Sequence, residues 1–169
     1  AISLKIKRPP VMLVHGNWSD SSLWDFIDVG ELDANKRYRT YRANFSDVMS
    51  GGIAAARWPV FSQIKHAIAD FATTENIAVA QVDVVAYSLG GLLMREISRT
   101  DGFTDVSYLK QGWVHKLITI DTPHRGSPFA SNVIATPQCR WLFEGDETPV
   151  GQNISDMALD SKLLSQLST

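Results

Sequence analysis

Apolar residues along the chain occur in two patterns, as short continuous runs and as stripes at helical spacing. Continuous runs cover residues 11–14, 82–87 and 117–120, and a more polar run covers 38–44. Runs of this length that end in glycine or polar residues are typical of strands buried in a parallel sheet. The polar character of 38–44 predicts a strand nearer the edge.

Between these runs, apolar residues recur at intervals of three and four. The clearest stripe lies in 57–72, where one face of a predicted helix carries Trp58, Phe61, Ile64, Ile68 and Phe71. Further helices are predicted over 19–27, 90–99, 127–135 and towards the end of 154–167. Glycine and proline predict loops at 51–52 and 136–153.

Strands that alternate with helices predict an α/β protein with a parallel, doubly wound sheet. A chain of 169 residues with 44% hydrophobic side chains can form one domain around its own core, so a single domain is predicted over 1–169. The formal net charge is -2, and no basic run or basic–aromatic stripe indicates nucleic-acid binding. The single cysteine, Cys139, excludes an internal disulfide and a cysteine-based zinc site.

A serine stands at the end of the run 82–87, in the stretch A-Y-S-L-G-G. Chemistry in parallel sheets is found at the carboxyl ends of the strands, where Ser88 would lie. The small residues Ala86 and Gly90, two positions on either side, would allow the strand and the next helix to approach closely. This arrangement predicts a nucleophile elbow with Ser88 as nucleophile. In the alternative interpretation, Ser88 only caps the helix that follows.

The stretch H-G-N-W after the first strand is placed where an oxyanion loop would belong. The main-chain amide of Asn17 would then face the main-chain amide of Leu89 across a developing oxyanion. We expect His15 to hold this loop through hydrogen bonds rather than to act on a substrate.

Three motifs carry a resemblance to a known family: V-M-L-V-H-G-N, V-D-V-V-A-Y-S-L-G-G-L-L-M-R and T-P-H-R-G-S. Together they resemble the lipase/esterase branch of the α/β-hydrolase superfamily. The terminal S-D-M-A-L-D-S-K-L-L-S-Q-L is similar to the segment that follows the Pro-His element in bacterial lipases. One departure is Tyr87, where such lipases usually carry histidine; we expect it to tune the site, because it points away from Ser88 in an alternating strand.

The resemblance implies a hydrolase of carboxylic esters that forms an acyl-enzyme on Ser88, which water then cleaves, without a metal or other cofactor. It also implies a small-molecule ester or lipid substrate and transient contact with a lipid interface. Similar bacterial lipases are often exported, which favours a secreted protein. Two alternatives stay open: an acyltransferase on the same fold, and a non-catalytic binding module that retains the fold.

Activation of Ser88 requires a histidine and a carboxylate, which in this fold follow the serine in the order acid, then histidine. His115 would lie about 16 Å from the end of the fourth strand, at about 3.3 Å per residue, and cannot reach the site. His124 and Asp121 are at the correct end and are candidate base and acid, although the Pro-His element is structural in similar lipases. We therefore expect strands beyond residue 169 to supply the activating pair.

Two further expectations concern apolar side chains. Without those strands, 117–120 would form an exposed apolar sheet edge. Either a partner segment covers this edge, or the edge promotes association of the chain. Trp18 and Trp24 stand near the oxyanion loop, where they would line an acyl pocket or pack in the core.

Overall fold

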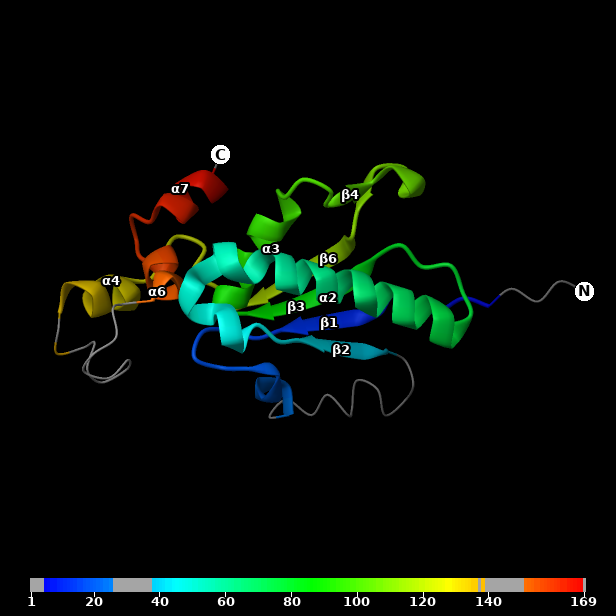
Figure 1. Ribbon diagram of the computed structural model, residues 1–169, viewed down its shortest axis with the longest axis horizontal. Coiled ribbons are helices and arrows are strands. Elements are labelled where there is room, and N and C mark those ends of the chain that lie inside the picture. The colour runs from blue at the N-terminus through cyan, green and yellow to red at the C-terminus, as the bar shows by residue number, and fades with distance from the viewer. Residues whose placement is uncertain (1–4, 26–37, 137, 139–150, 169) are drawn as a thin grey trace, which may run out of the picture.

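A parallel sheet of four strands forms the centre of the molecule, in a computed structural model that describes residues 5–25, 38–136, 138 and 151–168. Its strand order is β2-β1-β3-β6, with every neighbouring pair parallel. The strands are β1 (Val11–Val14), β2 (Thr40–Ala43), β3 (Val82–Tyr87) and β6 (Val114–Ile120). The predicted α/β class and parallel sheet are confirmed. The arrowheads of β3 and β6 point towards the C-terminal helices (Figure 1).

Burial along the strands follows their positions in the sheet. β1 lies between two strands and is buried throughout, which explains its continuous apolar sequence. β2 lies at one edge, as its more polar sequence predicted. β6 begins at Val114, three residues before the predicted start, because the polar His115 and Lys116 interrupt the apolar pattern between Val114 and Leu117.

The longest helix, α2 (Gly52–Glu75), carries the predicted apolar face but starts five residues earlier than predicted. The predicted loop at 51–52 is therefore wrong: Gly51 ends the 3-10 helix η2 (Ser46–Gly51), and Gly52 begins α2. Gly52 has a φ of 74°, and a Cβ built on it would lie 2.5 Å from Oδ2 of Asp156. The glycine there permits a close helix contact, which sequence reasoning read as a chain break.

The remaining helices agree with the predictions in position but differ in length. α3 (Leu89–Ser98) and α4 (Pro128–Ala135) lie within one residue of the predicted bounds. The helix predicted towards the end of 154–167 is α7 (Lys162–Leu167). A second short helix that was not predicted, α6 (Gln152–Met157), precedes it, and extended backbone at Ala158 and Ser161 separates the two. The first predicted helix is a 3-10 helix, η1 (Ser21–Asp25), and its predicted continuation to residue 27 lies outside the described residues.

A small hairpin between α3 and β6 was not predicted. It consists of β4 (Thr104–Asp105) and β5 (Gln111–Gly112), which are antiparallel, joined through the 3-10 helix η3 (Val106–Tyr108). Strands of two residues are too short to produce a hydrophobic period, so the sequence pattern contains no signal for them.

The two faces of the sheet are covered by different elements. Met12, Val14, Val84 and Ala86 belong to the larger core, which also holds the buried faces of α2 and α3. Because side chains alternate along a strand, Val11 and Leu13 face the opposite side. There they pack with Trp24 of η1, which is 1% exposed.

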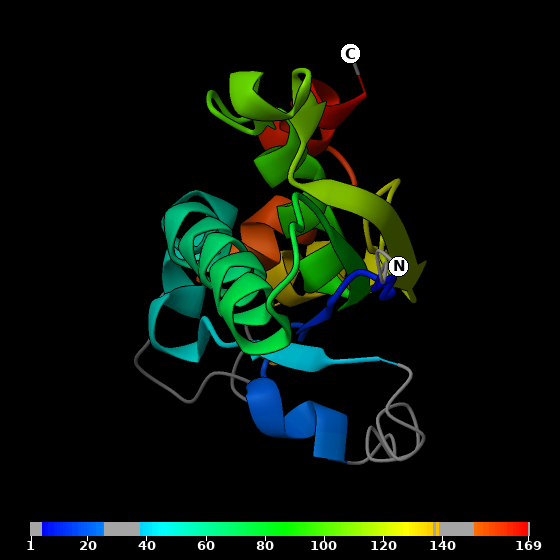
Figure 2. The same cartoon turned by 90° about the vertical axis from the view of Figure 1, so that its right-hand side faces the viewer.

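The outer side of β6 forms an open edge of the sheet, at the right in Figure 2. Leu117, Ile118 and Ile120 are 38%, 54% and 41% exposed, which confirms the predicted exposed apolar strand. Within the described ranges, no strand pairs with this side of β6. Unpaired strand edges are templates for pairing with another segment. Among the described residues, no helix is both long enough and apolar enough to cross a bilayer.

Candidate active site

Ser88 lies between the end of β3 and the start of α3 in a backbone conformation that is rare for a residue with a side chain. Its φ is 51° and its ψ is −124°. Such conformations cost about 1–3 kcal/mol and persist only where neighbouring contacts hold them. Here the Ser88 amide donates to the carbonyl of Ile120 at 2.8 Å. The Ser88 carbonyl accepts from the amide of Gly91 and from Oγ1 of Thr122, each at 3.0 Å.

The Ser88 side chain does not cap the helix that follows. No hydrogen bond joins its hydroxyl to an amide of α3, so the interpretation of Ser88 as a simple helix cap is wrong. Among the described residues, the hydroxyl makes no hydrogen bond, and the side chain is partly exposed. The turn therefore presents an unengaged hydroxyl at the carboxyl end of a central strand.

Two glycines after Ser88 bring α3 close to the neighbouring strands. A Cβ built on Gly90 would lie 2.4 Å from the carbonyl oxygen of His15, and one on Gly91 would lie 2.1 Å from Oγ1 of Thr122. Neither position has room for a side chain. The approach predicted at Gly90 was between α3 and the strand before it. The contact found there is instead between α3 and the end of β1, and Gly91 makes an equivalent contact with the loop after β6.

The predicted oxyanion loop packs directly on this turn. A Cβ built on Gly16 would lie 2.8 Å from Cβ of Ser88, so the loop after β1 touches the serine. Asn17 follows this contact, and Leu89 follows Ser88 itself in the first turn of α3. Neither main-chain amide donates to an acceptor in the described part of the chain. Two unengaged N–H donors thus belong to residues that adjoin this contact, one of them at a helix N-terminus, where the dipole favours negative charge.

His15 supports the loop from inside, as expected. It is fully buried and stacks on the ring of Phe45, with centroids 4.0 Å apart. Its Nε2 accepts from the Phe45 amide at 3.2 Å, so Nδ1 carries the hydrogen and donates to the Gly16 carbonyl at 2.9 Å. Burial lowers the pKa of His15, while the hydrogen bond to Gly16 opposes that shift. Both ring nitrogens are engaged, which leaves His15 no group for substrate.

Two contacts that sequence reasoning missed hold the turn at Asn17. The amide of Trp18 donates to Sδ of Met49 at 3.1 Å, and Trp18 has a φ of 53°. The Asn17 side chain accepts from Nδ2 of Asn153 at 2.5 Å. Neither Met49 nor Asn153 stands in a motif, and Asn153 falls within the segment predicted as loop. No local pattern could have identified them.

The two tryptophans near the loop have different environments. Trp24 is in the smaller core, whereas Trp18 is 47% exposed and contacts Phe129 of α4 edge to face, with centroids 6.1 Å apart. Phe129 is itself 45% exposed. The predicted acyl pocket therefore retains one candidate of the two, Trp18. It lies one residue beyond the oxyanion loop and has a second aromatic ring beside it.

The loop after β6 does not bring a base to Ser88. Nδ1 of His124 lies 3.3 Å from a guanidinium nitrogen of Arg95, and Nε2 lies 3.1 Å from Oγ1 of Thr119. Because arginine only donates, Nδ1 holds a lone pair and Nε2 carries the hydrogen. Burial, followed by the charge of Arg95, lowers the pKa of His124. Asp121 is exposed and has a φ of 50°. Within the described ranges, no hydrogen bond joins it to Ser88 or His124.

The other histidines lie elsewhere. His115, near the start of β6, contacts Oδ1 of Asp83 at 2.9 Å, at the end of β3 opposite to Ser88. Its predicted distance from the site agrees with this position. His66 is exposed on α2, as expected for a surface histidine.

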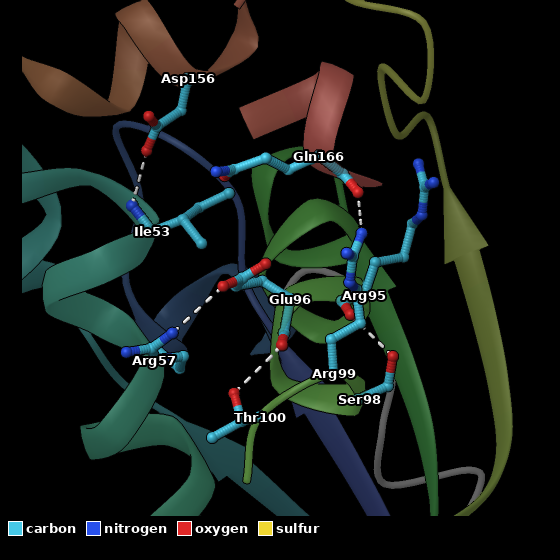
Figure 3. Close-up of polar contacts among 9 residues, drawn as sticks. All are labelled: Ile53, Arg57, Arg95, Glu96, Ser98, Arg99, Thr100, Asp156 and Gln166. Carbon is cyan, nitrogen blue, oxygen red and sulfur yellow. Dashed lines mark hydrogen bonds and ion pairs between the residues drawn. The ribbon is translucent and has the colours of Figure 1, made fainter. Parts of the chain in front are cut away.

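Polar contacts fix α3 to the helices around it. Arg57 of α2 pairs with Glu96 at 3.1 Å, and Arg95 donates to the Leu167 carbonyl at 2.6 Å (Figure 3 shows Arg57, Glu96 and Arg95). Arg99, the residue after α3, donates to the carbonyl of Gln166, so two arginines engage the last carbonyls of α7. The helix that follows Ser88 is therefore anchored at its far end. In the part of the chain that the structure covers, no group of three or more potential ligands could hold a metal ion.

The chain resembles known proteins in structure much more than in sequence. No family model and no curated protein matches the sequence. Among solved structures, a lipase from Bacillus licheniformis aligns with 96% of this chain at a TM-score of 0.66 and 18% identity. Lipase B from Aspergillus fumigatus and phospholipase PlaB from Legionella pneumophila each align with 95%, at TM-scores of 0.63 and 0.62 and 16% identity.

The chain spans only part of each of these proteins: 58% of the Bacillus lipase, 33% of the Aspergillus lipase and 35% of the Legionella phospholipase. Identities of 16–18% support conclusions about the fold alone. Over most of its length, the chain has the α/β-hydrolase fold.

Proposed function

We propose that the protein is a serine hydrolase of carboxylic esters, with Ser88 as the nucleophile. The observation that carries the proposal is the Ser88 backbone, whose φ of 51° is held by contacts from β6 and α3 while the hydroxyl remains unengaged. A strained serine between a central strand and a helix is the arrangement of a nucleophile elbow. The fold shared with lipases and a phospholipase agrees with this chemistry.

In the proposed reaction, Oγ of Ser88 attacks the ester carbonyl carbon, and the carbonyl oxygen becomes an oxyanion. The amides of Asn17 and Leu89 donate to that oxygen, because both are unengaged and adjacent to Ser88. A base takes the serine proton and passes it to the departing alcohol, which leaves an acyl-enzyme. Water then attacks the acyl carbonyl, and the carboxylic acid departs with restoration of the serine.

We place the base and its carboxylate outside the described residues. His124 is the nearest candidate in the sequence, but its lone pair faces Arg95 and its N–H faces Thr119. Asp121 contacts no histidine in the described ranges. In the proposed reaction, His124 supports the loop after β6 and Asp121 takes no part.

The exposed aromatic pair supports an apolar acyl group in the substrate. Trp18 and Phe129 offer two partly exposed rings beside the oxyanion loop. Aromatic rings bury large apolar areas, which suits an alkyl chain or the surface of a lipid aggregate. We therefore assign the substrate to lipid-like esters, and the transient contact at a lipid interface to this pair.

A fluorophosphonate probe tests the proposal, because it phosphonylates an activated serine irreversibly. We expect the natural protein to be labelled, with the adduct mapped to the peptide that contains Ser88, and Ser88→Ala to abolish labelling. Ser98→Ala serves as a matched control, since Ser98 is exposed on the same helix and its hydroxyl bonds only the Arg95 carbonyl. Labelling that survives Ser88→Ala, or its absence from the natural protein, would contradict the proposal.

One observation favours a second candidate, a non-catalytic binding module. The described residues contain no base in contact with Ser88. If the natural protein resists the probe yet binds a lipid ester with micromolar affinity at the same site, this second function would replace the first.

A further inference from the structure

Helix α6 connects two segments that are far apart in the sequence. At one end, Nδ2 of Asn153 donates to Oδ1 of Asn17, a contact across 136 positions. Towards the other end, Oδ2 of Asp156 accepts from the amide of Ile53 in the first turn of α2, at 2.8 Å. Figure 3 shows the Asp156 carboxylate directed at this amide. The helix thus joins the oxyanion loop to the longest helix of the fold.

The Asp156 end is firmly held. Nε2 of Gln152 donates to Oδ1 of Asp156 at 2.9 Å, and Oγ of Ser161 donates to its carbonyl at 2.8 Å. Asp156 is 8% exposed and lies against Gly52, where a Cβ would come within 2.5 Å of its carboxylate. Because these contacts surround α6, its first turn is a fixed point from which Asn153 can hold another segment.

The Asn17 end is arranged so that the side chain is held while the main-chain amide is not. The side chain contacts Asn153, and the next amide, that of Trp18, is taken by Met49. The amide of Asn17 itself has no acceptor among the described residues. The loop is thereby held by contacts of the Asn17 side chain and of the next amide, on either side of the Asn17 N–H that would face an oxyanion.

The hydrogen bond between Asn153 and Asn17 contributes little to the stability of the fold. Asn153 is 5% exposed, and its Oδ1, like Nδ2 of Asn17, is buried without a hydrogen-bond partner in the described part of the molecule. A buried pair of amides that satisfies only half of its polar atoms stabilises less than an apolar pair of similar shape. A polar pair fixes orientation, however, which an apolar pair does not.

We propose that Asn153 is a positioning residue for the oxyanion hole, which orients the Asn17 amide towards Ser88 through the Asn17 side chain. This inference rests on the proposed function. It assigns a role in catalysis to a residue outside the three motifs, in a segment 65 positions after Ser88. Asn153 touches no reacting atom and acts only through Asn17.

The test compares Asn153→Ala and Asn153→Leu with Ser155→Ala in the natural protein. Leucine fills the volume without a donor, which separates hydrogen bonding from packing. Ser155 is on the same helix, and its side chain makes no hydrogen bond within the described residues. Removal of a whole oxyanion donor costs about 10²–10³ in rate, so displacement of one should slow phosphonylation of Ser88 by about tenfold. We expect both Asn153 variants to show this loss and Ser155→Ala to stay within about twofold.

A second measurement reports on the loop without any reaction. Amide hydrogen exchange of the peptide that contains Asn17 should accelerate in both Asn153 variants, whereas exchange of the peptide that contains Phe61, in the buried middle of α2, should not change. Slower phosphonylation together with faster exchange at Asn17 supports the inference. Unchanged exchange at Asn17, or faster exchange with an unchanged phosphonylation rate in the Leu variant, would overturn it.

These outcomes separate the inference from the proposed function. If the parent protein is not phosphonylated at all, the proposed function fails, and this result comes from the unsubstituted protein. In that case the role in an oxyanion hole fails with it, while exchange at Asn17 still reports whether Asn153 holds the loop.

Discussion

Two neighbouring loops at the carboxyl end of the sheet use their polar groups in opposite ways. In the turn between β3 and α3, the amide and carbonyl of Ser88 form hydrogen bonds with neighbouring segments. The Ser88 hydroxyl and the Leu89 amide remain unengaged. The loop after β6 engages its side chains: Thr122 donates to the Ser88 carbonyl, and His124 contacts Arg95 and Thr119. Both loops carry polar groups of the kinds used in catalysis, but only in the first loop are such groups free of hydrogen bonds to the described residues.

The difference arises from how closely each loop is packed. Three glycines, Gly16, Gly90 and Gly91, let the β3–α3 turn touch the segments on both sides of it. These contacts restrict the backbone at Ser88, whose side chain is partly exposed. In the loop after β6, the side chains themselves make the contacts, so their polar atoms are already engaged in hydrogen bonds. A polar side chain in these loops therefore stays unengaged where the backbone makes the packing contacts, and is engaged where the side chain makes them.

The largest effect is expected from Gly90→Ala. A Cβ at this position would lie 2.4 Å from the backbone oxygen of His15, which cannot move without displacing the oxyanion loop. Overpacking of this kind costs about 1–3 kcal/mol, and we expect the upper half of that range. Urea denaturation would measure the change in the free energy of unfolding.

Gly102→Ala is the control for Gly90→Ala. Gly102 has a φ of 80° but nothing within 4 Å of a built Cβ, so only backbone strain opposes the substitution, at about 1–2 kcal/mol. Equal losses in the two variants would show that the contact at Gly90 is not the special feature of the elbow, and the contrast between the two loops would weaken.

A moderate effect is expected from pH, through His15. Burial lowers its pKa in the folded state, so below about pH 6.5 the unfolded chain binds more protons than the folded chain. The stability associated with neutral His15 is therefore present above that pH and is lost as the pH falls through the folded-state pKa. Urea midpoints from pH 8 to pH 5 should decline in the parent protein and decline less steeply in His15→Asn.

A further variant separates the contribution of His15 from that of the other histidine whose pKa is shifted. His124 also has a lowered pKa, so His124→Ala should reduce the slope in the same direction. A parent slope that persists in His15→Asn would contradict the role of buried His15.

The smallest effect is expected from His124→Ala on the reactivity of Ser88. A general base contributes about 10²–10⁴ in rate, whereas loss of a supporting contact in the next loop should change phosphonylation less than about threefold. The rate of probe labelling is the measurement. A loss of a hundredfold would identify His124 as the base and would remove the contrast between the two loops.

The sequence pattern predicted the elements that carry a strong hydrophobic period. β1, β3 and the apolar face of α2 follow directly from their residue spacing, and β3 was predicted with its observed bounds. Ser88 was identified from its position between a strand and two glycines. Local chemistry determines features of this kind, so one sequence suffices to find them.

Contacts between distant segments could not be predicted in the same way. The start of α2 at Gly52 depends on Asp156, more than 100 positions away, and the hold on Asn17 depends on Asn153. Glycines read as breaks at 51–52 proved to be places of close helix contact. The engagement of His124 likewise depends on Arg95 of another helix, which motif spacing does not reveal.

The strained backbone of Ser88 has a consequence for how this chain can evolve. Glycine adopts a φ of 51° without the cost of about 1–3 kcal/mol that serine bears there. A mutation to glycine would thus make the protein more stable while it removes the hydroxyl. Selection for stable folding alone would therefore favour glycine over serine at this position.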